Sequence, residues 1–359
     1  MKIAVITLPL LNNYGGNLQA FAMMRLLKNL GHQPVFLNLQ LTHSLEFWVK
    51  FIIKKYFLFF INKYKNPFFL NRKKCMKRFI DDFIIPQSKK ICSQNELLYF
   101  FKNSNLDACI VGSDQVFSSI GVLGFRDIYS LGFLSDNIIK LSYAASFGGD
   151  KYKGGNINFH SQNLKKFKAI SVREKSGVKI CKEIFGVGAK HVLDPTMMLE
   201  ASEYKSLFAD IKNSKTNGKI FVYILDKNKE KTDAIKKFAK DKNLEVYEIN
   251  DGNSSQDAIS IEEWLKNIYD ADIIVTDSFH GCVFSILFNK QFYAFVNKER
   301  GVDRFYSLFE MFDLNDRVVN DAKFSPKEID YKKVDEILKN QKEYSKEFLI
   351  SNLESNNIK

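Results

Sequence analysis

Short apolar runs alternate with amphipathic stretches along most of the chain, and this alternation predicts repeated strand–helix units. In the first half, the predicted strands lie at 3–8, 35–39, 108–112, 140–146 and 169–173. In the second half, they lie at 219–225, 244–249, 273–275 and 292–296. Helical periodicity separates them, including 17–30, 229–241, 260–269 and 279–288. Strands joined through helices form parallel sheets, so the pattern predicts an α/β fold of two Rossmann-like domains facing a cleft.

The chain leaves its first domain near residues 191–196, where Asp194-Pro195 predicts a turn because proline disfavours a helical residue before it. We expect the first domain at 1–197, with a helical insertion at about 44–105. The second domain follows at 198–325, and a lysine-rich helix with a polar tail completes the chain at 326–359. A length of 359 residues is enough for two domains, each with its own core.

The stretch 273–283 carries the strongest chemical signal. Its apolar strand runs into Thr276, Asp277 and Ser278, three residues typical of helix N-caps, and an apolar helix follows. A strand that ends at a helix start presents unpaired backbone N–H groups, which attract phosphate or carboxylate. His280 lies in the first helical turn. The basic residues Lys298, Arg300 and Arg304 follow within about one strand–helix unit, which predicts an anion site beside a titratable group.

Other candidate residues follow the strands of the first half. Ser113, Asp114 and Gln115 come at the end of the 108–112 strand, where ligand sites of α/β folds form, and Arg173 ends a later strand. Residues 12–16 are predicted to form a turn containing Gly15 and Gly16, which is not a GxGxxG dinucleotide fingerprint. These glycines allow close approach of the backbone, either to another part of the protein or to a ligand.

Composition limits which partners and which compartment suit this protein. Lys and Arg number 53 against 41 Asp and Glu, a formal net charge of +12 that suits an acidic partner. Scattered lysines without a recognition motif argue against nucleic acid. Five cysteines without CxxC spacing argue for a reducing compartment and against zinc, and the N-terminal apolar run is too short for a signal peptide. We therefore expect a cytoplasmic protein.

Residues 45–61 combine many aromatic side chains with Lys50, Lys54 and Lys55. These charges argue against a membrane-spanning helix. A basic aromatic helix of this kind binds an anionic bilayer surface, so peripheral contact with the inner membrane face is one interpretation. The other is a helical insertion that packs on the first domain.

Six stretches in order carry a family resemblance: Asn13–Ala20, Val111–Val116, Ser142–Gly148, Ile170–Glu174, Val192–Thr196 and Thr276–Gly281. On these motifs the chain resembles the polysaccharide pyruvyl transferase family over roughly residues 1–317. The resemblance implies a B-type glycosyltransferase-like fold. It also implies transfer of enolpyruvate from phosphoenolpyruvate to two hydroxyls of a sugar, giving a cyclic pyruvate ketal and phosphate. The family motif often reads Ser-x-Arg-x-His, and Ser278 stands at the arginine position here.

On this resemblance we expect His280 and Asp114 to be catalytic, with His280 as general acid. The expected donor-binding residues are Arg173, Ser278, Lys298, Arg300 and Arg304. The expected acceptor-side residues are Asn13, Tyr14, Gly15, Gly16, Gln19, Ser113 and Asp114. No metal or cofactor is expected beyond phosphoenolpyruvate as co-substrate. The acceptor would be a glycan or lipid-linked oligosaccharide of exopolysaccharide or capsule synthesis at the cell envelope.

Two other functions fit the same residues. A nucleotide-sugar glycosyltransferase would use His280 and the arginines to hold a diphosphate, and a non-catalytic envelope protein would only bind glycan. His280 could also be a helix-start histidine that is hydrogen-bonded for structure. Asp114 and Asp277 could activate acceptor hydroxyls or serve as caps and turns.

Overall fold

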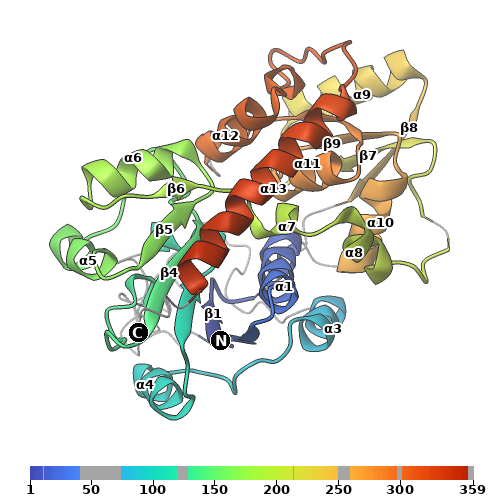
Figure 1. Ribbon diagram of the computed structural model, residues 1–359. Helices are drawn as coiled ribbons and strands as arrows, with labels where there is room; N and C mark the ends of the chain where they lie inside the picture. The colour runs from blue at the N-terminus through green and yellow to red at the C-terminus, as the bar shows by residue number, and fades with distance from the viewer. Residues whose placement is uncertain are drawn as a thin grey trace, which may run out of the picture.

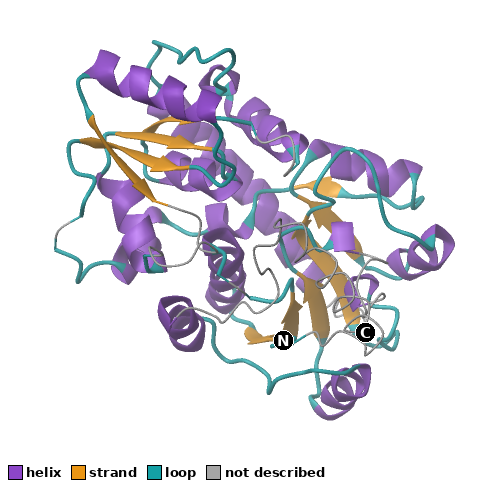
Figure 2. Cartoon of the chain, turned by 180° about the vertical axis from the view of Figure 1, so that it is seen from behind, coloured by secondary structure: helices purple, strands orange, loops and turns teal. Residues whose placement is uncertain are grey.

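The computed structural model describes residues 1–10, 12–40, 74–119, 128–212, 214–249, 259–296 and 301–354. Within them the chain forms two parallel sheets with helices on both faces (Figures 1 and 2). The first sheet contains, in spatial order, β2 (Gln33–Phe36), β1 (Lys2–Ile6), β3 (Ala108–Val111), β4 (Ile139–Ala145), β5 (Ala169–Val172) and β6 (Lys190–His191). The second contains β10 (Gln291–Ala294), β9 (Ile273–Thr276), β7 (Lys219–Tyr223) and β8 (Glu245–Ile249). The α/β class predicted from the sequence is confirmed.

The helices of the first half are α1 (Tyr14–Asn29), α3 (Lys74–Phe83), α4 (Gln94–Asn103), α5 (Ile157–Leu164) and α6 (Lys175–Glu183). Two short helices, α7 (Pro195–Met198) and α8 (Ala201–Leu207), connect the sheets. The second half adds α9 (Lys229–Lys242), α10 (Ile261–Asp270), α11 (Phe279–Leu287), α12 (Val302–Phe312) and α13 (Tyr331–Leu353). In Figure 1, α13 is the long red helix that runs from the second sheet back across the first, where it contacts α7 and β4.

Capping residues explain where these helices begin. The Asn13 side chain accepts a hydrogen bond from the Gly16 backbone N–H at 3.1 Å, so α1 starts at Tyr14. The prediction of a turn at 12–16 was therefore wrong, and both glycines lie in the first helical turn. Ser260 and Glu263 form a capping box at the start of α10. Ser278 caps α11 by accepting from the Gly281 N–H at 3.3 Å, which confirms that predicted helix start.

The largest hydrophobic cluster is continuous between the two sheets. It extends from Ile3 and Val5 in β1, through α1 and α7, to α11 and Phe292 in β10. Tyr14 of α1 stacks on Trp264 of α10 with ring centroids 5.3 Å apart, and its hydroxyl donates to the Ile259 carbonyl at 2.9 Å. The domains thus share a core on their facing sides, and separate clusters cover only their outer faces. This differs from the expectation of one core per domain, because α1 and α10 bury their apolar sides against each other.

The topology brings the loops that follow the strands to one region. In the first sheet the strand order reverses between β1 and β3, and in the second between β7 and β9. Parallel α/β sheets bind ligands outside the carboxyl ends of strands at such reversals. The loop after β1 and the loop after β3 are joined by a hydrogen bond from the Thr7 hydroxyl to the Ser113 carbonyl at 2.7 Å.

Candidate functional site

The first turns of α1 and α11 meet at Gly15 and His280. A Cβ built on Gly15 would lie 2.0 Å from Nδ1 of His280 and 2.4 Å from its Cγ, so only glycine leaves room for the imidazole. His280 is the second residue of α11, Gly15 is the second of α1, and the His280 side chain is 9% exposed. Two helix starts therefore meet at one histidine. The two halves of the molecule contribute one each.

Asp194 lies behind the histidine, in the segment that joins the sheets. Its Oδ1 is 3.8 Å from Nε2 of His280 and accepts hydrogen bonds from the Thr196 N–H at 3.0 Å and the Thr196 hydroxyl at 2.7 Å. Its Oδ2 accepts from the Ser113 hydroxyl at 2.7 Å and from Nη1 of Arg173 at 2.8 Å. Burial alone would raise the pKa of Asp194, but His280 and Arg173 hold it well below its ordinary value. The carboxylate is ionised.

Arg173 is an internal cation of this cluster. Its side chain is 1% exposed and also donates to Oδ1 of Asp114 at 3.3 Å. Burial disfavours the guanidinium charge, but Asp194 and Asp114 outweigh that effect and raise the pKa of Arg173. The predicted donor-binding arginine and the predicted catalytic Asp114 are thus partners in one ion-pair group.

Asp114 has a backbone φ of 80°, a conformation that residues other than glycine rarely adopt. Its Oδ1 accepts from the N–H of Gln115 at 2.9 Å, and its carbonyl accepts from Ser146 at 2.9 Å, which links the ends of β3 and β4. Sixteen per cent of the Asp114 side chain is exposed. It is therefore the part of the ion-pair group most open to a ligand.

Two arginines lie near the Phe279 ring. The guanidinium carbon of Arg173 lies 4.8 Å from the ring centroid, and that of Arg304, in α12, lies 5.6 Å from it. Glu174 lies in the same region, with Oε1 accepting from the Phe147 N–H at 2.7 Å. Burial raises the pKa of Glu174 although the charge of Arg173 opposes the shift. Arg304, predicted from the sequence as a donor ligand, is thus within reach of the α11 start.

The remaining predicted residues are placed in different ways. Ser278, at the usual arginine position, caps α11. Tyr14 and Gln19 are 1% exposed, the former in the shared core and the latter donating to the Thr7 hydroxyl at 3.2 Å and the Gly16 carbonyl at 2.9 Å. Asn13 is exposed at the mouth of the site, and Gly16 is half-buried. Lys298 and Arg300 lie outside the described residues.

Asp277 has a structural role. Its carboxylate accepts from the backbone N–H groups of Leu225 at 2.6 Å and Asp226 at 3.1 Å, and from Nζ of Lys231 at 2.7 Å. The side chain is fully buried. It therefore joins the loops after β7 and β9 at the strand-order reversal of the second sheet.

Sequence reasoning missed Asp194 and Glu174 as members of the site. Both lie in stretches that carry the family resemblance, but Asp194 was interpreted as the residue before a turn-forming proline and Glu174 was given no role. The signal that could have marked both is their type and position, because each follows a strand of a parallel sheet at its carboxyl end.

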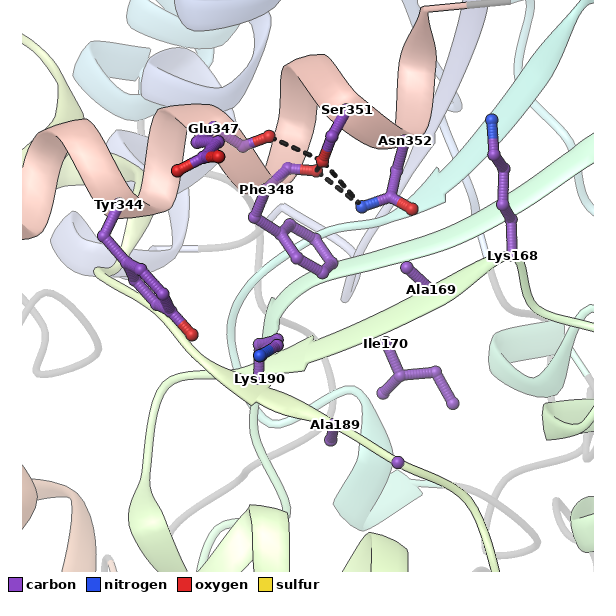
Figure 3. Close-up of a pocket in the computed structure, with 11 residues that line it drawn as sticks. Lys168, Ala169, Ile170, Ala189, Lys190, Tyr344, Glu347, Phe348, Ser351 and Asn352 are labelled. Atoms are coloured by element: carbon purple, nitrogen blue, oxygen red, sulfur yellow. Dashed lines mark hydrogen bonds between the residues drawn. The ribbon is translucent and has the colours of Figure 1, made fainter. Parts of the chain in front are cut away.

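Figure 3 shows a different cavity, of about 570 Å³, at the amino-terminal ends of β5 and β6. The last turns of α13 close it with Tyr344, Phe348 and Asn352. It contains none of the predicted site residues. Among the described residues, no group of three or more His, Cys, Asp or Glu side chains is arranged to hold a metal ion. No described helix combines the length and apolarity needed to cross a bilayer.

Solved structures share this fold. A UDP-GlcNAc 2-epimerase from Neisseria meningitidis, solved with UDP-GlcNAc, aligns over 98% of this chain and 99% of its own with a TM-score of 0.54 and 10% identity. S. aureus MnaA, solved with UDP, aligns over 97% and 88% with a TM-score of 0.51 and 11% identity. At this identity the likeness establishes the fold alone, which is the B-type glycosyltransferase-like arrangement of two facing α/β domains.

The family follows from the sequence. A family model described as polysaccharide pyruvyl transferase matches residues 13–299, most of the chain. No curated protein matches the sequence. The chain belongs to the polysaccharide pyruvyl transferase family and is a transferase, and its membership implies a polysaccharide acceptor.

Proposed function

We propose that this transferase moves the enolpyruvate group of phosphoenolpyruvate onto two hydroxyls of a sugar in a surface polysaccharide or its lipid-linked precursor. The observation that supports this most is the meeting of two helix starts at His280, with Arg173 and Arg304 both near the ring of the adjoining Phe279. Phosphoenolpyruvate carries a phosphate and a carboxylate, which suit helix N-termini and guanidinium groups.

In the proposed reaction His280 delivers a proton to the methylene carbon of the donor, and a sugar hydroxyl adds to C2. Phosphate then leaves from C2, and a second hydroxyl replaces it. One of the two hydroxyl protons restores His280, and the other leaves with phosphate, so atoms and charges balance. A positioned general acid contributes typically about 10²–10⁴-fold to such a rate. Asp114 is the proposed acceptor-side carboxylate because it is the exposed member of its ion-pair group.

Donor binding is proposed to involve Arg304 in place of the arginine that Ser278 replaces. Arg173 is held by Asp194 and Asp114, so its charge is largely neutralised before any donor binds. The His280 imidazole is enclosed between the domains, which means that the first turns of α1 and α11 must separate to admit a substrate.

The test is incubation of purified protein with phosphoenolpyruvate and candidate lipid-linked glycans, with measurement of phosphate release and of the ketal on the glycan. We expect both in wild type, and loss of both in His280→Ala. His32→Ala is the matched control, because His32 lies in the turn after α1. Turnover near the wild-type rate in His280→Ala rejects the assignment. Release of a nucleotide from a nucleotide sugar, with no phosphate from phosphoenolpyruvate, would favour a glycosyltransferase instead.

Peripheral attachment to the anionic inner membrane face is part of the same proposal, since lipid-linked acceptors are assembled there. It depends on residues 45–61, which lie outside the described residues. Each Lys or Arg near an anionic surface contributes about 1 kcal/mol, so a few lysines suffice for attachment without a membrane span.

A further inference from the structure

Asp194 has one carboxylate oxygen toward each half of the site. Oδ1 faces Nε2 of His280 at 3.8 Å, and Oδ2 binds Nη1 of Arg173 at 2.8 Å. Its side chain is 1% exposed, so solvent does not screen either interaction. Pairing with Arg173 alone does not require Asp194 to face the histidine, which belongs to the other domain.

The two ring nitrogens of His280 have different neighbours. Gly15, in the first turn of α1, packs against Nδ1. Oδ1 of the ionised Asp194 lies nearest Nε2.

We propose that Asp194 is a positioning residue for His280. Its carboxylate favours the ring tautomer in which the Nε2 proton is directed at Oδ1. Nδ1, the ring atom nearest Gly15, is then the nitrogen that delivers the proton once the first turns of α1 and α11 separate. This inference deepens the proposed function and depends on it for the identity of the proton acceptor, but the state of the ring does not depend on any substrate.

The experiment is nuclear magnetic resonance of ¹⁵N-labelled histidine side chains, with the His280 signals assigned from His280→Ala. In wild type we expect the neutral ring to carry its proton on Nε2. In Asp194→Asn the fraction of neutral rings that carry their proton on Nδ1 should rise, because the negative charge that favours a proton on Nε2 has been removed. A neutral ring protonated on Nδ1 in wild type, or an unchanged tautomer ratio in folded Asp194→Asn, overturns the inference.

Thr196→Val provides a second variant, needed because Asp194→Asn also weakens the buried pair with Arg173. It removes the hydroxyl that donates to Oδ1 at 2.7 Å and leaves the carboxylate and Arg173 in place. With one hydrogen bond fewer, Oδ1 is more available to the Nε2 proton, so the Nε2-protonated tautomer should not become less populated, in contrast to Asp194→Asn. A fall of that tautomer in Thr196→Val contradicts the inference. Absence of pyruvyl transfer to any glycan would count against the proposed function and leave these ring measurements standing.

Discussion

Gly15→Ala tests the contact on which the site depends. The added Cβ would lie 2.0 Å from Nδ1, 2.4 Å from Cγ and 2.7 Å from Cε1 of His280, whereas Cβ contacts in proteins are not shorter than 3.0 Å. Either the imidazole or the first turn of α1 must therefore move by about 1 Å. The ring has little freedom to turn away, because its side chain is 9% exposed and Asp194 lies on its other edge.

Two opposing effects set the magnitude. Replacing a helical glycine with alanine stabilises by roughly 0.5–1 kcal/mol, and overpacking a filled site costs roughly 1–3 kcal/mol. Gly15→Ala should therefore change stability by between about zero and −2.5 kcal/mol. A 1 Å misplacement of a catalytic group lowers turnover by about 10²-fold. We therefore expect Gly15→Ala to lose most of its turnover even under conditions in which the variant is still folded.

Gly16→Ala is the matched control on the same helical turn. Its Cβ would meet the nearest atom, in the side chain of Asn13, at 3.4 Å, which is an ordinary contact, so Gly16→Ala should gain stability. We would compare thermal unfolding midpoints and phosphate release of both variants with wild type. In the double variant Gly15→Ala/His280→Ala the clash is absent, so the stability that Gly15→Ala alone loses should be restored. Equal midpoints for Gly15→Ala and Gly16→Ala would refute the packing of His280 on Gly15.

Three further outcomes are expected. Asp277→Asn should lower stability by roughly 1–3 kcal/mol, because a carboxylate that binds two backbone N–H groups and Lys231 is lost; urea unfolding without a change in midpoint would contradict this role. Glu174→Gln should raise the thermal midpoint at pH 7. Burial raises the pKa of Glu174 in the folded state, so the folded protein loses stability as pH rises above the unfolded pKa and this carboxyl group ionises. Glutamine does not ionise, so the higher midpoint of Glu174→Gln should disappear near about pH 4, where glutamate is protonated in both states. Lys54→Glu/Lys55→Glu should reduce flotation with anionic vesicles at low salt, and absence of flotation by the wild type would end the membrane proposal.

Local patterns predicted the parts of this protein that depend on neighbouring residues. Apolar runs located the strands of both sheets to within a few residues, except the two-residue β6, which was not predicted. Ser260 and Ser278 located two helix starts. The placement of His280 in a first helical turn followed from the same reasoning. The pattern failed at Gly15 and Gly16, because Gly-Gly is typical of turns, while the Asn13 cap and the shared core hold them in a helix.

The contacts within the site were decided by tertiary structure. Gly15, Asp194 and His280 are far apart in the sequence, and hydrophobic periodicity reports only which face of an element is buried. Their meeting depends on the rotation of one sheet against the other, which the stacking of Tyr14 on Trp264 and the common core of α1, α10 and α11 determine. For the same reason Asp194 was interpreted as part of a turn. A carboxylate before a proline has the same local sequence whether it faces water or, as here, a buried arginine and a histidine from the other domain.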